Sequence, residues 1–347
     1  MIIVTGDIGA TNSRLALLDS TEHSPNAGPL PLRGVEQFCN DDFSSPQQLV
    51  AHYLENCGQQ PEVACFAIAA PVPDIVPGQD QSVRLTNYPW HFSSAEFTRQ
   101  FSFNNVYFIN DYRGFPYVTD YFNRASSPDQ VLEIQTSESG QPDEFSLPRT
   151  ELIFGAGTGL GCVIARKDSH AVTVIASEAG HCDISGSSNT LRKIIAFLAQ
   201  HQLPLCWETL LSGPGIETLY AYVTGASTID RDARTASDIT RQAKSSPNSK
   251  AFQTVELFIN LAGVFARNMA LACLADEVYL VGNIFNILFD IVPVDIVPGK
   301  PFLNGFHDTT QHQDLLRSVT IRLLRDRQTG LKAAAAYAMH RELLEKR

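Results

Sequence analysis

Positive charge is scarce in this chain of 347 residues. Lys and Arg together number 26 against 37 Asp and Glu, which gives a formal net charge of -11 at pH 7. Proteins that bind nucleic acid neutralise its phosphates with clustered Lys and Arg, so this composition argues against a nucleic-acid partner. An acidic chain can still bind a nucleotide, because loop amides and a Mg²⁺ ion supply a positive field locally.

Paired cysteines and long apolar runs are also missing. The 7 cysteines are odd in number and include no CxxC pair, which favours reduced thiols in a cytosol over a disulfide framework. The N-terminus lacks the basic segment and apolar run of a signal peptide, and no uncharged stretch approaches the roughly 20 residues of a membrane span. We therefore expect a cytoplasmic protein with no membrane partner.

Strands and helices are predicted to alternate along a chain long enough for two domains. Predicted strands cover 1–5, 14–18, 63–69, 106–109, 151–154, 162–166, 171–176, 277–281 and 318–324. Predicted helices cover 46–55, 94–100, 190–201, 207–211, 214–223, 250–275 and 331–346. The polar segment Ser126–Pro148 is expected to be an exposed loop. A β–β–β–α–β–α order that occurs twice predicts two similar α/β lobes with a cleft between them.

The two repeats predict two lobes in the chain. We expect a small lobe of residues 1–110 that takes back the C-terminal helix from about 330–347, and a large lobe of residues 111–329. Lys332, in the otherwise apolar closing helix, is expected on a solvated helix face.

Two glycine-rich turns, each between two apolar strands, carry the main functional signal. Their sequences are GDIGATN at 6–12 and GAGTGLG at 155–161. Glycines let a backbone approach a ligand closely, Thr11 and Asn12 add donors, and the Asp7 carboxylate can hold a hydrated cation. The first turn alone is explained equally well by turn geometry, whereas four glycines alternating with small residues in the second favour a phosphate loop.

Two other phosphate loops do not fit the sequence. GxxxxGK[ST] is absent, which excludes a P-loop NTPase. The dinucleotide fingerprint GxGxxG also fails, because its last glycine would fall on Leu160 or Cys162.

A carboxylate follows the apolar strand 106–109. Asn110 and Asp111 stand directly at its end, where a carboxylate that faces a cleft can accept a proton from a substrate hydroxyl. A turn or helix N-cap aspartate is the competing interpretation of the same position.

Three further polar residues suit a polyol. Glu178 and His181 follow the strand 171–176, and Glu208 precedes the turn Ser212–Gly215. Carboxylates accept hydroxyl protons, and a neutral imidazole both donates and accepts. A surface turn and an exposed helix carboxylate are the alternatives. A metal site at residues 181–183 is disfavoured, since three adjacent residues do not readily converge on one ion.

Taken together and in order, these motifs resemble the bacterial glucokinase family, the ATP-dependent hexose kinases of the actin-like ATPase superfamily. The motifs are GDIGATN, AIAAPV (67–72), LTNYPW (85–90), IND (109–111), GAGTGLG, SEAGHCD (177–183), ETLLSGPG (208–215) and GLKAAAA (330–336). The related ROK sugar kinases share the ExGH element but normally carry a Cys-rich zinc motif after it, which this sequence lacks. The resemblance implies a two-lobed actin-like ATPase (ribonuclease H-like) fold with a central cleft.

The resemblance also implies an activity and a set of site residues. The activity is ATP-dependent phosphorylation of glucose to glucose 6-phosphate, with Asp111 as general base, Mg²⁺ near Asp7 and a homodimer as the usual assembly. The implied sugar-binding residues are Asn87, Asn110, Asp111, Glu178, His181 and Glu208. The implied ATP-binding residues are Gly6, Asp7, Gly9, Ala10, Thr11, Asn12, Gly155, Gly157, Thr158 and Gly159, with Gly282 and Asn283 on the adenosine side.

Three departures from the family pattern bear on nucleotide affinity and sugar choice. Ala10 replaces the second glycine of GDxGGTN, GEGGH becomes SEAGH with Ala179, and GGI becomes Gly282-Asn283-Ile284. Asn tolerates positive φ better than most residues, so we expect the last turn to survive. A kinase for another hexose and a non-catalytic sugar-binding regulator are the alternatives. The intact Asp111 and the lack of a DNA-binding element count against the regulator.

Overall fold

The chain folds into two compact α/β units. The computed structural model describes residues 1–21, 30–76, 79–86, 88–124, 129–137, 147–169, 171–229, 234–292, 299–309 and 311–345. One unit comprises Met1–Ser127 and Asp326–Arg347, and the other comprises Pro128–Arg325. The first unit therefore extends past the expected boundary at residue 110, because the segment after β7 packs on the C-terminal helix of the same unit.

The first unit is built on a five-stranded sheet. Its strands, in the order β3-β2-β1-β4-β7, are Leu32–Cys39, Asn12–Asp19, Ile2–Ile8, Val63–Ile68 and Asn105–Asn110. The first two pairings in this order are antiparallel, and the last two are parallel. The other elements of the unit are η1 (Asn40–Asp42), α1 (Pro46–Cys57), β5 (Ser82–Arg84), β6 (His91–Ser93), α2 (Ser94–Phe101), η2 (Phe115–Tyr117), α3 (Thr119–Asn123) and α11 (Thr329–Glu345).

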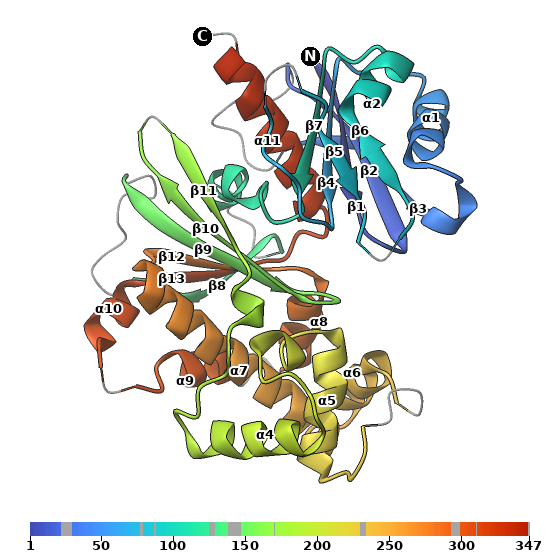
Figure 1. The fold of residues 1–347 in the computed structure, drawn as a ribbon. Helices are drawn as coiled ribbons and strands as arrows, with labels where there is room; N and C mark the ends of the chain where they lie inside the picture. Colours follow the sequence, from blue (N-terminus) through green and yellow to red (C-terminus); the bar gives the residue numbers. More distant parts are fainter. Residues whose placement is uncertain are drawn as a thin grey trace. The chain divides into compact units, whose positions relative to one another are not determined.

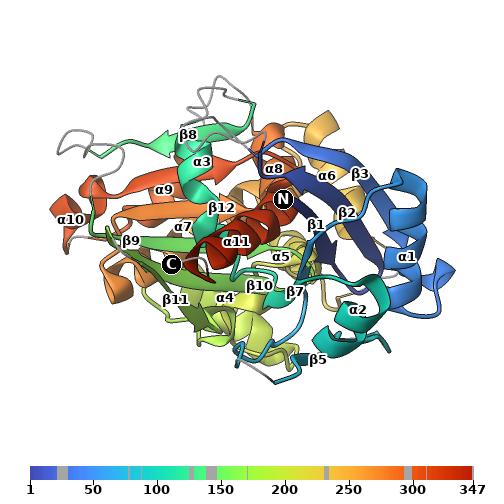
Figure 2. The same cartoon turned by 90° about the horizontal axis from the view of Figure 1, so that it is seen from above.

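Helices cover both faces of this sheet (Figures 1 and 2). Alternate strand residues point to opposite faces, so Phe66 and Phe108 pack with Phe97 of α2 in an aromatic core. On the other face, the Thr5 hydroxyl donates to the Leu331 carbonyl of α11 at 2.9 Å. The C-terminal helix thus packs on the N-terminal sheet.

The second unit repeats the same sheet and adds one strand. Its order is β11-β10-β9-β12-β13-β8, with β11 at Val172–Ser177, β10 at Leu160–Lys167, β9 at Arg149–Ala156, β12 at Glu277–Val281, β13 at Thr320–Leu324 and β8 at Val131–Gln135. The strands from β11 to β13 have the same antiparallel and parallel pairings as those from β3 to β7. This repeated topology confirms the predicted fold class.

A long helix forms the core of the second unit. Helix α7 (Lys250–Cys273) packs Phe258 and Phe265 against the sheet residue Phe154 and the α8 residue Phe285. It is the one helix in the described ranges that is long and apolar enough to cross a membrane, and its mostly buried apolar residues identify it as a core helix. The remaining elements are η3 (Ala179–His181), α4 (Asn189–Gln200), η4 (Trp207–Thr209), α5 (Gly213–Thr224), α6 (Ala236–Ser245), α8 (Asn283–Ile291), α9 (Lys300–Phe306) and α10 (Gln313–Ser318).

Two sequence expectations are corrected by the structure. The segment Ser126–Pro148, expected to be an exposed loop, contains strand β8, which pairs antiparallel with β13 and buries Ile134. Lys332 is not solvated: its side chain is buried, its Nζ pairs with the Asp326 carboxylate, and it lies 5.8 Å from the centroid of the Phe122 ring. A local sequence pattern reveals neither the β8–β13 pairing nor the Lys332–Asp326 ion pair. The first joins strands that are distant in the chain, and the second joins residues on opposite sides of a turn.

Candidate functional site

The first glycine-rich turn is a tight connection between β1 and β2. Ile8 pairs with Ser13, and the Gly9 amide donates to the Asn12 carbonyl at 3.1 Å. No residue of this fully described turn has a positive φ, so Ala10 occupies its position without backbone strain. Gly6 is required for space instead, because a Cβ there would lie 2.5 Å from the Phe66 ring.

Asn40 fixes the conformation of this turn. Its buried side chain donates from Nδ2 to the carbonyls of Gly9 (2.9 Å) and Ala10 (3.0 Å), and its Oδ1 accepts from the Ser13 hydroxyl at 2.7 Å. Its backbone amide donates to the Thr11 carbonyl at 2.9 Å. Sequence reasoning missed Asn40, because an asparagine in a polar run after a strand is also an ordinary turn residue.

Asp7 and Asp111 are the two candidate-site carboxylates of the first unit. Asp7 lies near the end of β1, and Asp111 follows β7 directly, two strands away across β4. Burial raises the pKa of Asp7, and the Arg14 charge opposes this shift. Burial, together with the negative charge of Asp7, raises the pKa of Asp111 to about 7. A carboxyl group that titrates near neutral pH is suited to accept a proton.

Asn110 shapes the turn that presents Asp111. Its Nδ2 donates to the Ala70 carbonyl at 3.1 Å, and its Oδ1 accepts from the Tyr112 amide at 3.0 Å. The Asp111 amide donates to the Ile68 carbonyl at 3.2 Å, which holds the residue to the end of β4. Asn87, the remaining sugar-binding candidate of this unit, lies outside the described residues.

The second glycine-rich turn connects β9 and β10 and is held by the start of α5. The Gly157 amide donates to the Gly159 carbonyl, and the Gly157 carbonyl accepts from the Gly213 amide, both at 2.8 Å. Ser212 caps α5 by accepting from the Gly215 amide at 3.1 Å. A Cβ on Gly215 would lie 2.4 Å from the Leu210 carbonyl oxygen, so glycine at this position of SGPG lets the start of α5 lie close to the Leu210 backbone.

The turn at Gly282 differs from the expectation. The positive φ (96°) belongs to Gly282, while Asn283 is the first residue of helix α8. Asn283 therefore needs no left-handed conformation, and its tolerance of positive φ is irrelevant here. Gly282 remains the residue that this turn requires, because few residues with a Cβ adopt such a φ.

Glu178, His181 and Glu208 come together in the second unit, although 30 residues separate the outer two. His181 lies between the two carboxylates, with Nδ1 3.4 Å from Glu178 Oε2 and Nε2 3.5 Å from Glu208 Oε1. The exposed fraction of the side chain is 88% for Glu178, 60% for His181 and 33% for Glu208. Accessible carboxylates on both sides of an imidazole offer donors and acceptors to a polyhydroxyl ligand.

Asp7 is a candidate ligand for a divalent cation. The described residues contain no group of three or more His, Cys, Asp or Glu able to hold a metal ion by themselves. Mg²⁺ is commonly bound through one or two carboxylates together with water and substrate phosphates. Asp7 is half-buried, and burial raises its pKa, so a cation would stabilise the negative charge of its carboxylate.

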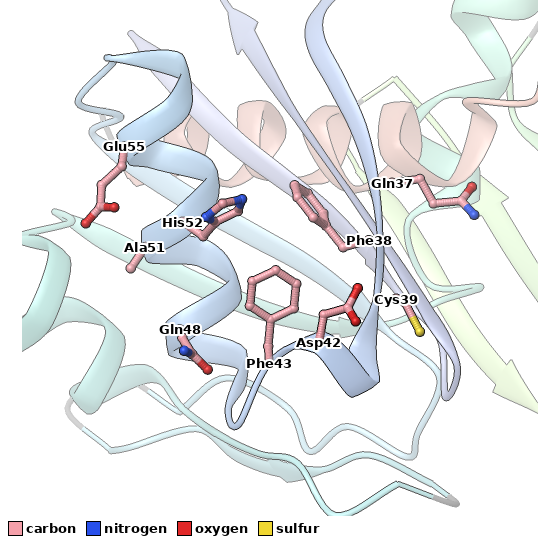
Figure 3. A pocket seen from close by; sticks show the side chains of 9 residues that line it. All are labelled: Gln37, Phe38, Cys39, Asp42, Phe43, Gln48, Ala51, His52 and Glu55. Atoms are coloured by element: carbon pink, nitrogen blue, oxygen red, sulfur yellow. The ribbon is translucent and has the colours of Figure 1, made fainter.

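A separate hollow of about 630 Å³ lies in the first unit between β3, η1 and α1 (Figure 3). The rings of Phe38, Phe43 and His52 gather there, with Phe38 and Phe43 centroids 5.7 Å apart. The carboxylates of Asp42 and Glu55 also line it. None of the residues predicted from the sequence belongs to this hollow, so it is not the candidate site.

Over nearly its whole length, the chain is similar to known proteins of one family. A family model described as Glucokinase matches residues 4–341. The chain is 26% identical over 340 residues to the glucokinase of Pectobacterium atrosepticum, which covers 96% of each chain. It is 27% identical over 340 residues to that of Saccharophagus degradans, covering 96% of this chain and 97% of the relative. A glucokinase structure from an Antarctic psychrotroph superposes with a TM-score of 0.80 at 27% identity, covering 98% and 99% of the two chains.

Proposed function

The chain belongs to the glucokinase family and is an ATP-dependent glucose kinase, and we propose that Asp111 is the general base of the transfer. The observation that carries this role is the position of Asp111 directly after β7 with a pKa raised to about 7. In the ionised form, its carboxylate accepts the proton of the glucose 6-hydroxyl as that oxygen attacks the γ-phosphorus of ATP. The products are glucose 6-phosphate and ADP.

We propose that three polar side chains of the second unit bind glucose. Glu178, His181 and Glu208 accept and donate hydrogen bonds to its hydroxyl groups, as their mutual distances and exposure allow. Asn110 and Asn87 of the first unit are proposed as further sugar-binding residues. Because the Asn110 side chain already bonds the backbone on both of its polar atoms, it also keeps Asp111 in place.

The two glycine-rich turns are proposed to bind the ATP phosphates. The first comprises Gly6, Asp7, Gly9, Ala10, Thr11 and Asn12, the second Gly155, Gly157, Thr158 and Gly159, and Gly282 and Asn283 are proposed for the adenosine side. A glucokinase of the ROK family from Streptomyces griseus, 14% identical with a TM-score of 0.62, was solved with glucose and AMPPNP. Asp7 would hold Mg²⁺, which supplies charge neutralisation to the triphosphate when bound.

The cellular setting is proposed on separate grounds. All seven cysteines lie in described parts of the chain and carry free thiols there, which supports a reducing cytoplasm. A homodimer is proposed from the family resemblance.

A coupled assay of glucose 6-phosphate formation tests this proposal. We expect turnover with glucose and Mg²⁺-ATP, and Asp111→Ala should lower kcat by about 10²-fold or more while glucose binding changes far less. Near-normal turnover of Asp111→Ala would remove Asp111 as the base.

A hexose panel compares kcat/KM for glucose, mannose, fructose and amino sugars. A higher value for another sugar would assign the enzyme to that hexose. Sugar binding without turnover on the whole panel would instead support a regulator.

A further inference from the structure

The carboxylate of Glu208 lies directly against the second glycine-rich turn. Its Oε2 accepts a hydrogen bond from the Leu160 amide at 2.9 Å. A Cβ placed on Gly159 would lie 2.4 Å from the same oxygen and 3.1 Å from Cδ of Glu208. Only a residue without a side chain leaves this carboxylate where it is, so the glycine at 159 is explained by a contact inside the protein.

Gly157, two residues earlier in the same turn, is different. A Cβ on Gly157 would meet no atom within 4 Å, and neither glycine has a positive φ. No contact within the described chain therefore requires glycine at 157, which leaves its open side free to approach a ligand. Two glycines of one turn thus have separable roles.

The backbone that carries Glu208 is firmly anchored. Trp207 is buried and its amide donates to the Cys182 carbonyl at 3.3 Å, which joins η4 to the segment that bears His181. Leu210 and Leu211, which follow, are fully buried. A methyl group at position 159 would therefore displace the flexible end of the Glu208 side chain, while the anchored η4 backbone stays in place.

We propose that Gly159 and the Leu160 amide hold the Glu208 carboxylate in place, and that this part of the second glycine-rich turn determines sugar affinity. The inference rests on the proposed role of Glu208 in binding glucose. With Oε2 held by the Leu160 amide, Oε1 is directed toward His181 Nε2 at 3.5 Å. A carboxylate whose orientation is fixed before the sugar arrives loses less conformational freedom on binding. Gly159 is accordingly a positioning residue for the sugar site.

The test compares Gly159→Ala with Gly157→Ala, each without nucleotide, by calorimetric titration with glucose. We expect Gly159→Ala to weaken glucose binding about tenfold or more, because it dislodges an ionic hydrogen-bonding group. Gly157→Ala should change the glucose Kd less than about twofold, since its methyl group meets open space. An equal effect of the two substitutions on the glucose Kd would overturn the inference. Thermal melting of both variants shows whether each is folded.

A double-mutant cycle with Glu208→Ala separates this inference from the proposed function. If Gly159 acts through Glu208, the double variant Gly159→Ala/Glu208→Ala binds glucose no more weakly than Glu208→Ala alone. Additive losses of glucose-binding free energy would show that Gly159 does not act through Glu208 and would overturn the inference. If Glu208→Ala leaves the glucose Kd unchanged, the proposed sugar-binding role of Glu208 fails instead.

Discussion

The negative charge of Asp7, on β1, helps to raise the pKa of Asp111, at the end of β7, to about 7. The two residues are 104 positions apart, and the parallel pairing of β1, β4 and β7 brings them to the same end of one sheet. Two carboxylates in a partly buried setting disfavour each other's ionisation. The proposed base is thereby given a pKa close to neutral pH.

The pH dependence of catalysis follows from this relationship. A general base must be ionised, so we expect kcat/KM for glucose to rise with pH and to level off above about 7. Below that value it should fall about tenfold per pH unit. Because Asp7→Asn removes the neighbouring charge, it should lower the pKa of Asp111, which NMR titration of the carboxyl carbons can detect. A kcat/KM that stays flat down to about pH 5 would contradict the assignment.

Replacing Asp111 by asparagine should stabilise the protein while it inactivates the enzyme. The pKa of an unfolded aspartate is about 3.9, so between about pH 4 and 7 the folded chain retains a proton that the unfolded chain has released. Wild-type stability therefore falls as pH rises through this window. The asparagine variant lacks this loss, so its Tm advantage over wild type should grow from about pH 5 to about pH 8, as measured by calorimetry. A Tm difference independent of pH would contradict the raised pKa.

Asn40→Ser should weaken ATP binding through the first glycine-rich turn. The serine side chain is too short to donate to both the Gly9 and Ala10 carbonyls, which Asn40 reaches at 2.9 and 3.0 Å. At about 1 kcal/mol for each hydrogen bond, we expect the KM for ATP to rise roughly tenfold. The glucose Kd should stay nearly constant. Tyr53→Phe is a matched control, because it removes a hydrogen bond to Gly34 near the other end of β3. A similar rise in the KM for ATP in both variants would indicate a general loss of structure.

A buried ionic network in the second unit should matter more to stability than surface ion pairs do. Glu151 is fully buried, and its Oε1 lies 3.0 Å from Arg149 Nε and 2.9 Å from Lys167 Nζ. Glu151→Ala leaves two buried cations without this partner, so we expect a loss of about 3–5 kcal/mol in the free energy of unfolding. Arg241→Ala, which breaks an exposed pair with Asp238, should cost less than about 1 kcal/mol. Urea unfolding monitored by circular dichroism compares them, and equal losses would contradict the prediction.

Local patterns predicted most of the sheet strands, but they missed β3 and also β8, the strand in the polar segment before β9. Strand β8 is the short run Val-Leu-Glu-Ile-Gln inside a segment otherwise rich in Ser, Pro, Gln, Asp and Glu, and its pairing with β13 reveals it. The long core helix was predicted almost to the residue, because 24 residues with helical spacing leave little ambiguity. Lys332 shows the opposite case, since a charged residue on an apolar helix was expected in solvent and instead pairs with Asp326.

The sequence by itself determined the order of the elements, the family resemblance and the residue types at the candidate site. These depend on short stretches, where periodicity, turn residues and motifs are local properties of the chain. Only the tertiary structure decided that His181 lies between Glu178 and Glu208, that Asn40 holds the first turn, and that Gly159 makes room for the Glu208 carboxylate. Such contacts join residues tens of positions apart, and they are set by sheet register and close packing, which no local pattern encodes.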